Sequence, residues 1–397
     1  MNAIGLSVCA ALGFMLVGCG GSTAIGEVGV GGSGSNASGG EVTGGTGKGG
    51  GGSETAGAAG GTPAGAGASS GPAPDGLPCA VLQMAGQECV AAHSTVRVLV
   101  PGYTGSLYRV ERRDGQATDI GSINGYADAE AHAQFCSSNG GCVIKVIYDQ
   151  SPMGNDLTES PPGSAKPTPG KPVDASALKV QIDGREVYAM LFRPGQGYRR
   201  VIGNGMAVGD EPETIYMVSS QHDLLNGCCF DYGNAGRRAS NDGNGTVEAV
   251  YLGQGVIWGS GVGPGPWVMA DLENGLFPGW ENGQWSNIST NNSVEYDFVT
   301  AVLVGDTADK NDGMGRFALF GGDAAAGTLQ TMYDGIRPVK PGYVPMQKQG
   351  SIILSVAGDN SDGDGGRFYE GAIAKGAASS ETVDALQAAI VEAGYGK

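Results

Sequence analysis

Short β-prone runs separated by turn residues are the feature of this sequence that most limits its fold. The runs 299–304, 316–320 and 351–357 are rich in Val, Ile, Leu and Phe, and Gly or Asp clusters bound each of them. Apolar and polar residues alternate over 294–298, as in a strand with one buried face. Many short strands and few helices predict an all-β fold, either a sandwich or a barrel.

Two helices are expected beside the strands, over residues 127–135 and 380–393, where apolar residues recur at helical spacing. The sequence shows no internal repeat of the length found in propellers or solenoids. One β domain over residues 79–397 is therefore the simplest organisation of the body.

The part of the chain before residue 79 has a different character. Of the 74 glycines, 23 fall between residues 20 and 78, among Ser, Ala and Thr. A segment with so few large apolar side chains cannot offset the entropy that ordering would cost. We expect residues 19–78 to be a disordered tether, with a reach of roughly 40–45 Å by the scaling of Gly-rich chains.

Residues 1–18 are expected to be a signal peptide. Their apolar run, 4–17, has the length of a signal-peptide core and is too short to cross a bilayer. It ends in Leu16-Val17-Gly18-Cys19, which resembles the lipobox of bacterial lipoproteins, although residues 1–18 lack the usual Lys or Arg. We therefore expect an exported protein. It is either an outer-membrane or cell-surface lipoprotein acylated at Cys19 or a plainly secreted protein.

Six cysteines remain in the body, an even number that favours disulfides in an exported protein, although six cysteines allow 15 pairings. Proximity in the sequence suggests Cys79 with Cys89 and Cys136 with Cys142.

The last two cysteines, Cys228 and Cys229, are adjacent. Consecutive Cα atoms lie about 3.8 Å apart, below the usual disulfide range of about 4.4–6.8 Å. A vicinal bond and free or cross-paired thiols therefore both remain open. No His or Cys spacing is typical of zinc, and we expect neither a metal nor a cofactor.

Charge and carboxylates indicate the class of function. The net charge of −17 disfavours binding to nucleic acid. An exported, acidic, Gly-rich β protein suggests a carbohydrate partner, and sugar hydrolysis needs two carboxyl groups. Asp271 and Glu273 are predicted to share one face of a strand, and Asp359 stands where an apolar strand ends in Gly.

Several distinctive strings occur in order along the body. They are Cys89-Val90-Ala91-Ala92-His93-Ser94-Thr95, Ile147-Tyr148-Asp149-Gln150-Ser151, Gly154-Asn155-Asp156-Leu157-Thr158, Cys228-Cys229-Phe230-Asp231-Tyr232-Gly233-Asn234, Gly265-Pro266-Trp267, Met269-Ala270-Asp271-Leu272-Glu273-Asn274, Gly358-Asp359-Asn360-Ser361 and Phe368-Tyr369-Glu370-Gly371. In these strings and their spacing, the body resembles the catalytic domain of glycoside hydrolase family 54, the α-L-arabinofuranosidase B type.

The resemblance implies a concanavalin A-like β-sandwich, or jelly roll, and a retaining mechanism. Glu273 would be the nucleophile and Asp359 the general acid/base, with the two carboxyls about 5–5.5 Å apart as retention requires. Five further residues would bind or enclose the arabinose: Asp271, Asn274, Gly358, Trp258 and Leu276. Cys228 and Cys229 would form a vicinal disulfide against the sugar, and His93 would make a structural hydrogen bond.

The predicted function is that of a monomeric, exo-acting α-L-arabinofuranosidase that trims arabinoxylan or arabinan, held at a membrane only by its lipid. A non-catalytic, lectin-like surface lipoprotein is the alternative, because the same sandwich also hosts binding modules. Within the enzyme class, β-xylosidase activity is the alternative.

Overall fold

Two large antiparallel sheets, packed face to face, form the body of the protein. The computed structural model describes residues 76–137, 140–240 and 245–397. The predicted signal peptide, Cys19 and nearly all of the predicted tether lie outside these residues. Contacts of β13 and β14 with β16 and β17 join the two sheets, so the predicted β-sandwich is confirmed and the barrel alternative is wrong.

The first sheet has six strands. In spatial order they are β1 (Cys89–Ser94), β21 (Glu370–Lys375), β11 (Glu213–Ser219), β16 (Val299–Gly305), β17 (Phe317–Asp323) and β18 (Gln330–Gly335). Chain neighbours β16, β17 and β18 form a meander, whereas β1 pairs with β21 from the far end of the chain. The N-terminal strand therefore closes this sheet against the last strand of the body.

The second sheet has ten strands. In spatial order they are β15 (Leu276–Phe277), β14 (Trp267–Asp271), β13 (Glu248–Gly253), β12 (Asp231–Ala235), β19 (Ser351–Leu354), β10 (Tyr198–Arg200), β7 (Leu157–Glu159), β6 (Cys142–Ile147), β2 (Tyr108–Arg112) and β3 (Ala117–Ile120). Strand β19 is inserted between β12 and β10, which brings the segment after residue 354 beside strands from the middle of the chain.

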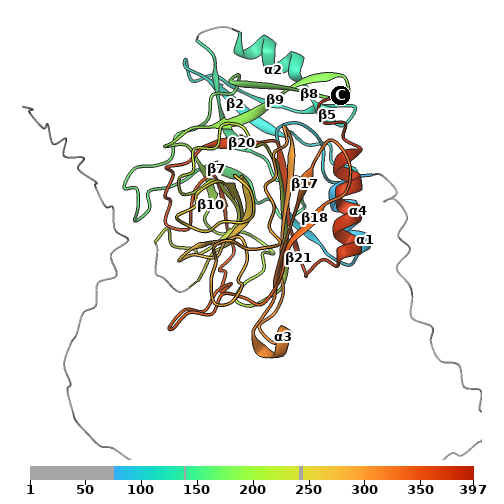
Figure 1. Ribbon diagram of the computed structural model, residues 1–397. Helices are drawn as coiled ribbons and strands as arrows, with labels where there is room; N and C mark the ends of the chain where they lie inside the picture. The colour runs from blue at the N-terminus through green and yellow to red at the C-terminus, as the bar shows by residue number, and fades with distance from the viewer. Residues whose placement is uncertain (1–75, 138–139, 241–244) are drawn as a thin grey trace, which may run out of the picture. The chain divides into compact units, whose positions relative to one another are not determined.

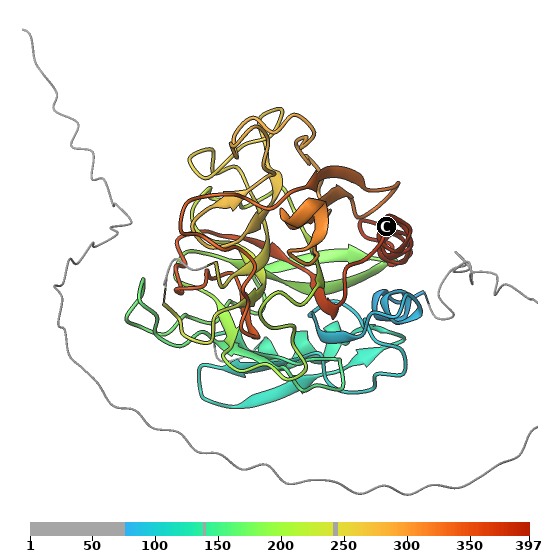
Figure 2. The ribbon, with the colours of Figure 1, turned by 90° about the horizontal axis from the view of Figure 1, so that it is seen from below.

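Smaller elements cover the sandwich. They are β20 (Gly366–Phe368), β9 (Arg185–Phe192) and β8 (Leu178–Ile182) in one sheet, β4 (Ser122–Ile123) and β5 (Tyr126–Ala127) in another, and helices α1 (Pro78–Met84), α2 (Ala129–Cys136), α3 (Lys310–Gly313) and α4 (Ser380–Val391). Helices α1 and α4 lie side by side against the six-stranded sheet (Figures 1 and 2). None of the helices in the described part of the chain combines the length and apolar character needed to cross a bilayer.

Most sequence-predicted elements are confirmed with shifted ends. The helix expected over 127–135 begins at Ala129, because the Asp128 side chain accepts from Ala131 N–H and caps it. The strand predicted over 294–298 is wrong. Its exposure does alternate, but it joins no sheet, since its backbone makes only isolated hydrogen bonds, to Pro266, Gln221 and Ala324.

Alternation along the central strands separates the core from a second face. Tyr232, Val250 and Ala270 stand in register on β12, β13 and β14 and belong to the main core. The Tyr232 hydroxyl lies 2.9 Å from His93 Nδ1 on β1, so this face points toward the six-stranded sheet. Because strand side chains alternate, Asp231 and Asp271 point to the opposite face of the ten-stranded sheet.

His93 is a structural residue, as expected. It is fully buried, and its Nε2 lies 2.9 Å from the carbonyl oxygen of Asn155. A carbonyl only accepts, so Nε2 carries the proton and Nδ1 accepts from the Tyr232 hydroxyl. Burial lowers the pKa of His93, which keeps the ring neutral.

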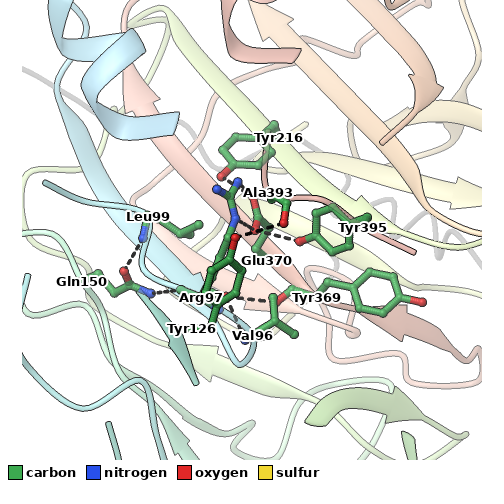
Figure 3. Close-up of polar contacts among 11 residues, drawn as sticks. Val96, Arg97, Leu99, Tyr126, Gln150, Tyr216, Tyr369, Glu370, Ala393 and Tyr395 are labelled. Atoms are coloured by element: carbon green, nitrogen blue, oxygen red, sulfur yellow. Dashed lines mark hydrogen bonds and ion pairs between the residues drawn. The ribbon is translucent and has the colours of Figure 1, made fainter. Parts of the chain in front are cut away.

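A buried ion pair joins the two ends of the body. Arg97 donates to both carboxylate oxygens of Glu370, at 2.6 and 2.7 Å, and the hydroxyls of Tyr395 and Tyr216 donate to the same carboxylate (Figure 3). Burial alone would lower the pKa of Arg97, but the Glu370 carboxylate raises it above its ordinary value. The C-terminal Tyr395 is thereby tied to the segment that follows β1.

We predict that Arg97→Met lowers the free energy of unfolding by about 3–5 kcal/mol, because it leaves the Glu370 charge buried without its partner. Urea unfolding followed by tryptophan fluorescence measures this loss. The control is Arg109→Met, which breaks the exposed pair with Asp119 and should cost about 1 kcal/mol or less. Equal losses in the two variants would contradict the importance of the buried pair.

Candidate active site

Glu273 lies at the tip of the turn that joins β14 to β15. The turn covers 272–275, and the flanking strands pair directly across it. Glu273 and Asn274 have φ angles of 56° and 55°, the left-handed region in which Asn and Gly are preferred at hairpin turns. A Glu in this conformation costs on the order of 1–3 kcal/mol. Strain of this size at a hairpin tip points to a functional position.

This turn corrects one expectation. Asp271 and Glu273 do not share the face of a strand, because β14 ends at Asp271 and the chain reverses immediately after it. They are nevertheless in contact, since the Glu273 N–H donates to Asp271 Oδ1 at 2.7 Å. An Asp that accepts from the N–H two residues later stabilises a turn.

Two residues from the segment after β18 hold the same turn from outside. The Tyr343 hydroxyl lies 2.6 Å from the carbonyl oxygen of Leu272 and 3.0 Å from that of Glu273. Lys340 Nζ donates to the carbonyl oxygen of Asn274 at 2.9 Å, and it lies 4.3 Å from the centre of the Trp285 ring. The left-handed turn is thus held on its backbone as well as through Asp271.

The Glu273 carboxylate is oriented by Thr246. Its Oε2 accepts from the Thr246 N–H at 2.7 Å and lies 3.2 Å from the Thr246 hydroxyl. Glu273 is only 6% exposed. Two donors on one oxygen fix the rotation of the carboxylate.

Asp359 lies in a second turn, five residues beyond the end of β19. Its Oδ1 accepts from the N–H and the hydroxyl of Ser361, at 2.9 and 2.8 Å. Chain packs closely on both sides of this turn. A Cβ on Gly358 would lie 2.5 Å from Val247, and one on Gly163 would lie 2.3 Å from the Asp359 carbonyl oxygen. Both positions therefore require glycine.

Arg199, on β10, holds the Asp359 turn from within. Its Nη1 donates to the carbonyl oxygen of Gly358 at 2.8 Å and to Asn360 Oδ1 at 2.7 Å, on either side of Asp359. The residue is 2% exposed, and no carboxylate of the described residues lies within ion-pair distance of it. Burial lowers the pKa of Arg199 to about 10, while the Asp359 charge opposes that shift. The guanidinium therefore senses the charge of Asp359 without forming an ion pair with it.

Asp271 shows that the two turns converge. Burial raises the pKa of Asp271 to about 6, and the charges of Glu273 and Asp359 both add to this shift. The contacts agree, because Gly358, next to Asp359, packs against Val247, and the neighbouring Thr246 binds the Glu273 carboxylate. Three acidic groups from two distant stretches of the chain are therefore gathered on one face of the ten-stranded sheet.

The adjacent cysteines form a disulfide beside this group. Cys228 and Cys229 are bonded, as are Cys79 with Cys89 and Cys136 with Cys142, so all three predicted pairs are present. The Cys229 sulfur lies within 4.8 Å of carboxylate oxygens of Asp231 and Asp271. A sulfur in a disulfide is not a thiolate, so this triplet lacks the soft ligand that a cysteine would supply to a metal.

The remaining predicted residues border the same region. Leu276 is buried as the first residue of β15 and stands opposite Asp271. Trp258 is half-buried, and the next residue, Gly259, packs against the Leu276 carbonyl, where a Cβ would lie 2.7 Å away. Trp258 and Leu276 therefore lie close enough to form parts of one wall.

The comparisons with known proteins agree with this arrangement. The family model described as "Alpha-L-arabinofuranosidase B, catalytic" matches residues 78–396. The chain belongs to this family. It is 45% identical over 325 residues to the alpha-L-arabinofuranosidase B of Aspergillus oryzae, covering 80% of this chain and 62% of that protein. It is 44% identical over 324 residues to a Trichoderma koningii protein named "Arabinofuranosidase/B-xylosidase", covering 80% of this chain and 63% of that one.

Solved structures of the arabinofuranosidase family share the fold. One is an arabinofuranosidase complexed with arabinofuranosyl-α-1,2-xylobiose, which matches with a TM-score of 0.75 and 41% identity. The match covers 80% of this chain and 65% of that one. The chain thus spans somewhat less than two thirds of the length of the relatives that it matches.

Sequence reasoning missed the residues that hold the site together. These are Thr246, Arg199, Tyr343 and Lys340. It also missed Asp231, which is buried beside Asp271. Asp231 carried a usable signal, because it is a charged residue between Phe230 and Tyr232, two aromatic residues that follow the paired cysteines. The others lie on separate strands or loops, and only the tertiary fold brings them to the acidic residues.

We predict that Arg199→Met lowers the free energy of unfolding by about 3 kcal/mol or more, because each hydrogen bond from a charged group contributes about 1.5–3 kcal/mol. The matched control is the next residue on β10, Arg200→Met, whose hydrogen bond to Ile202 is exposed. Thermal and urea unfolding compare the two variants. A loss at position 199 no larger than that at position 200 would contradict the role of Arg199.

Proposed function

We propose that this chain is a retaining, exo-acting α-L-arabinofuranosidase that removes arabinofuranosyl side chains from arabinoxylan or arabinan. The observation that carries the proposal is the convergence of Glu273 and Asp359 on Asp271 in a chain of this family. Retaining glycosidases need a nucleophilic carboxylate and a second carboxyl that acts first as acid and then as base. A strained turn presents the first of these, and a separate, rigid turn presents the second.

In the first step, a Glu273 oxygen attacks the anomeric carbon of the arabinofuranosyl group. The bond from that carbon to the leaving oxygen breaks, and the leaving oxygen takes the proton of Asp359. The product is an arabinosyl ester of Glu273 and a released alcohol. The step requires Asp359 to be protonated and Glu273 to be ionised at its start.

In the second step, water attacks the same carbon. Asp359, now ionised, accepts a proton from the water as the ester bond to Glu273 breaks, which restores the Glu273 carboxylate and the Asp359 acid. The buried Arg199 guanidinium, which holds the Asp359 turn from strand β10, places a positive charge near Asp359 while that residue is ionised between the two steps.

We propose that the sugar lies over Asp271, Asn274 and Gly358. The Cys228–Cys229 disulfide, Trp258 and Leu276 would then be its apolar boundary. Asp271 is suited to accept a sugar hydroxyl, since its Oδ1 already holds the Glu273 N–H and the pair is nearly enclosed. Apolar walls with a few convergent polar groups are typical of small-ligand sites.

β-Xylosidase activity is a second candidate within the enzyme class. The Trichoderma koningii relative carries both activities in its name. Parallel assays on aryl arabinofuranosides and aryl xylosides would distinguish the two activities in this chain.

We also propose that the protein is exported and that residues 79–397 are its catalytic unit. Three disulfides favour an oxidising compartment, because thiols stay reduced in the cytosol. Acylation at Cys19, with residues 20–78 as the tether, and a monomeric state remain part of this proposal. The lipobox-like string at 16–19 supports the first of these.

Glu273→Gly should abolish hydrolysis of p-nitrophenyl α-L-arabinofuranoside without lowering the melting temperature, because Gly adopts the left-handed φ of 56° without strain. Added azide should restore product by taking the place of the missing nucleophile. The control is Glu295→Gly at an exposed position, which should keep full activity. Full activity in Glu273→Gly would remove Glu273 from the mechanism.

Asp359→Asn should lose hydrolysis of substrates with poor leaving groups by about 100-fold or more, in keeping with typical contributions of general acid–base catalysis. With an activated aryl leaving group, the rate of the first step should fall less, because such a group needs less help from a proton donor. Steady-state and single-turnover kinetics separate the two steps. A pure, folded wild type that releases no nitrophenol would instead favour the lectin-like alternative.

Expressed with its leader in a bacterium, the full chain should partition into detergent, because an acyl chain on Cys19 would add buried apolar surface. Cys19→Ser should move the protein to the aqueous phase. Acylation at Cys19 would be contradicted if the variant still partitioned into detergent, or if both proteins partitioned into the aqueous phase. The secreted alternative would then remain.

A further inference from the structure

Asp231 is a second acidic residue behind Asp271, and the mechanism above leaves it without a role. It is the first residue of β12 and is fully buried. Neither of its side-chain oxygens receives a hydrogen bond from an N–H or O–H group of the described residues. Buried carboxyl oxygens are normally paired, so this exception requires an explanation.

The fold brings Asp231 to Asp271. Asp271 stands in register with Ala249, and Ala249 with Gly233, so only small residues lie across β13 and β12 at that level. Asp231 is two residues from Gly233 and therefore points to the same face. Carboxylate oxygens of the two Asp residues, together with Cys229 Sγ, lie within 4.8 Å of one another.

Two buried carboxyls in contact cannot both be ionised, so the pair holds a proton. Burial, followed by the Asp271 charge, raises the pKa of Asp231 well above its ordinary value. Asp271 already accepts the Glu273 N–H, which favours its ionised form. The proton therefore belongs on Asp231, and its natural acceptor is Asp271.

The other charged groups near Asp231 reinforce this assignment. Asp364 and Asp359 add negative charge from the loop after β19. Tyr251, on the neighbouring strand β13, directs its hydroxyl to Asp364 at 3.0 Å rather than to Asp231. These neighbours all favour the neutral form of Asp231.

We propose that Asp231 is a positioning residue that remains protonated and donates its proton in a hydrogen bond to Asp271. Asp271 then carries a single charge, holds the Glu273 N–H, and keeps its remaining lone pairs for a sugar hydroxyl. Asp271 thus accepts two hydrogen bonds, one from the carboxyl O–H of Asp231 and one from the backbone N–H of Glu273. The consequence for catalysis rests on the proposed function, whereas the protonation of Asp231 does not.

The first test measures protonation through stability. A carboxyl whose pKa is raised in the folded state keeps a proton that the unfolded chain loses above about pH 4. Wild-type stability therefore falls as pH rises, by about tenfold in the unfolding constant per pH unit. Asp231→Asn has no such proton to lose. The ratio of the wild-type to the variant unfolding constant should rise about tenfold per unit between pH 5 and 7.

Asp119→Asn is the control for this test. Hydrogen bonding to Arg109 lowers the pKa of Asp119, so this carboxyl is ionised in both states above pH 5. The ratio of the wild-type unfolding constant to that of Asp119→Asn should therefore not change with pH. A constant ratio for Asp231→Asn as well would overturn the proposal, and so would an infrared band of a protonated carboxyl that is unchanged in Asp231→Asn.

The second test compares two replacements of Asp231 by hydrolysis of p-nitrophenyl α-L-arabinofuranoside above pH 6, where Asp271 is ionised. Asp231→Asn retains an N–H donor and should keep kcat within a few-fold of wild type. Asp231→Val has none and should lose about 10- to 100-fold, the value of a hydrogen bond to a charged group. Equal kcat values in two folded variants would overturn the donor role. An inactive wild type would refute the proposed function, and the pH test would still decide the protonation of Asp231.

Discussion

The register of strand β12 decides which residues of this sandwich can take part in chemistry. Tyr232 points into the core and meets His93 on the other sheet, and Asp231 consequently points outward. The Asp231 carbonyl also accepts from the N–H of Ser355, which fixes β12 against β19. A slip of one residue would place the carboxyl in the core and the tyrosine at the site. The register of β12 therefore sets both the packing between the two sheets and the positions of the acidic side chains on the outer face of the ten-stranded sheet.

On the outer face of the ten-stranded sheet, each carboxyl group is held by a different hydrogen-bond donor. Glu273 is held by Thr246, Asp359 by Ser361, and Asp271 by a backbone N–H. The buried Arg199 adds positive charge beside Asp359 without forming an ion pair with its carboxylate. The Arg97 and Glu370 pair shows the contrast, because its charges neutralise each other fully and serve only the fold.

The sequence predicts the sandwich well, since short β-branched runs and Gly turns are local signals. It also points to Glu273, Asp271 and Asp359, although the turn geometry at Glu273 could not be predicted. A Glu-Asn pair has little preference for two left-handed residues, and the turn depends on Tyr343 and Lys340 from a distant segment. The strand expected over 294–298 failed for a similar reason, because alternation gives a buried face but does not supply a partner strand.

The pairing of β1 with β21 limits the order in which the parts of this chain can fold. Helix α1 likewise packs on α4, so the first helix and the first strand of the body both have a partner element near the end of the chain. The long loop between β1 and β21 must close before these two strands can pair, and this slows folding. Strand β1 therefore stays unpaired until β21 is available. A chain that emerges N-terminus first therefore cannot complete its sandwich during emergence. It completes the fold only after residue 375 has been released.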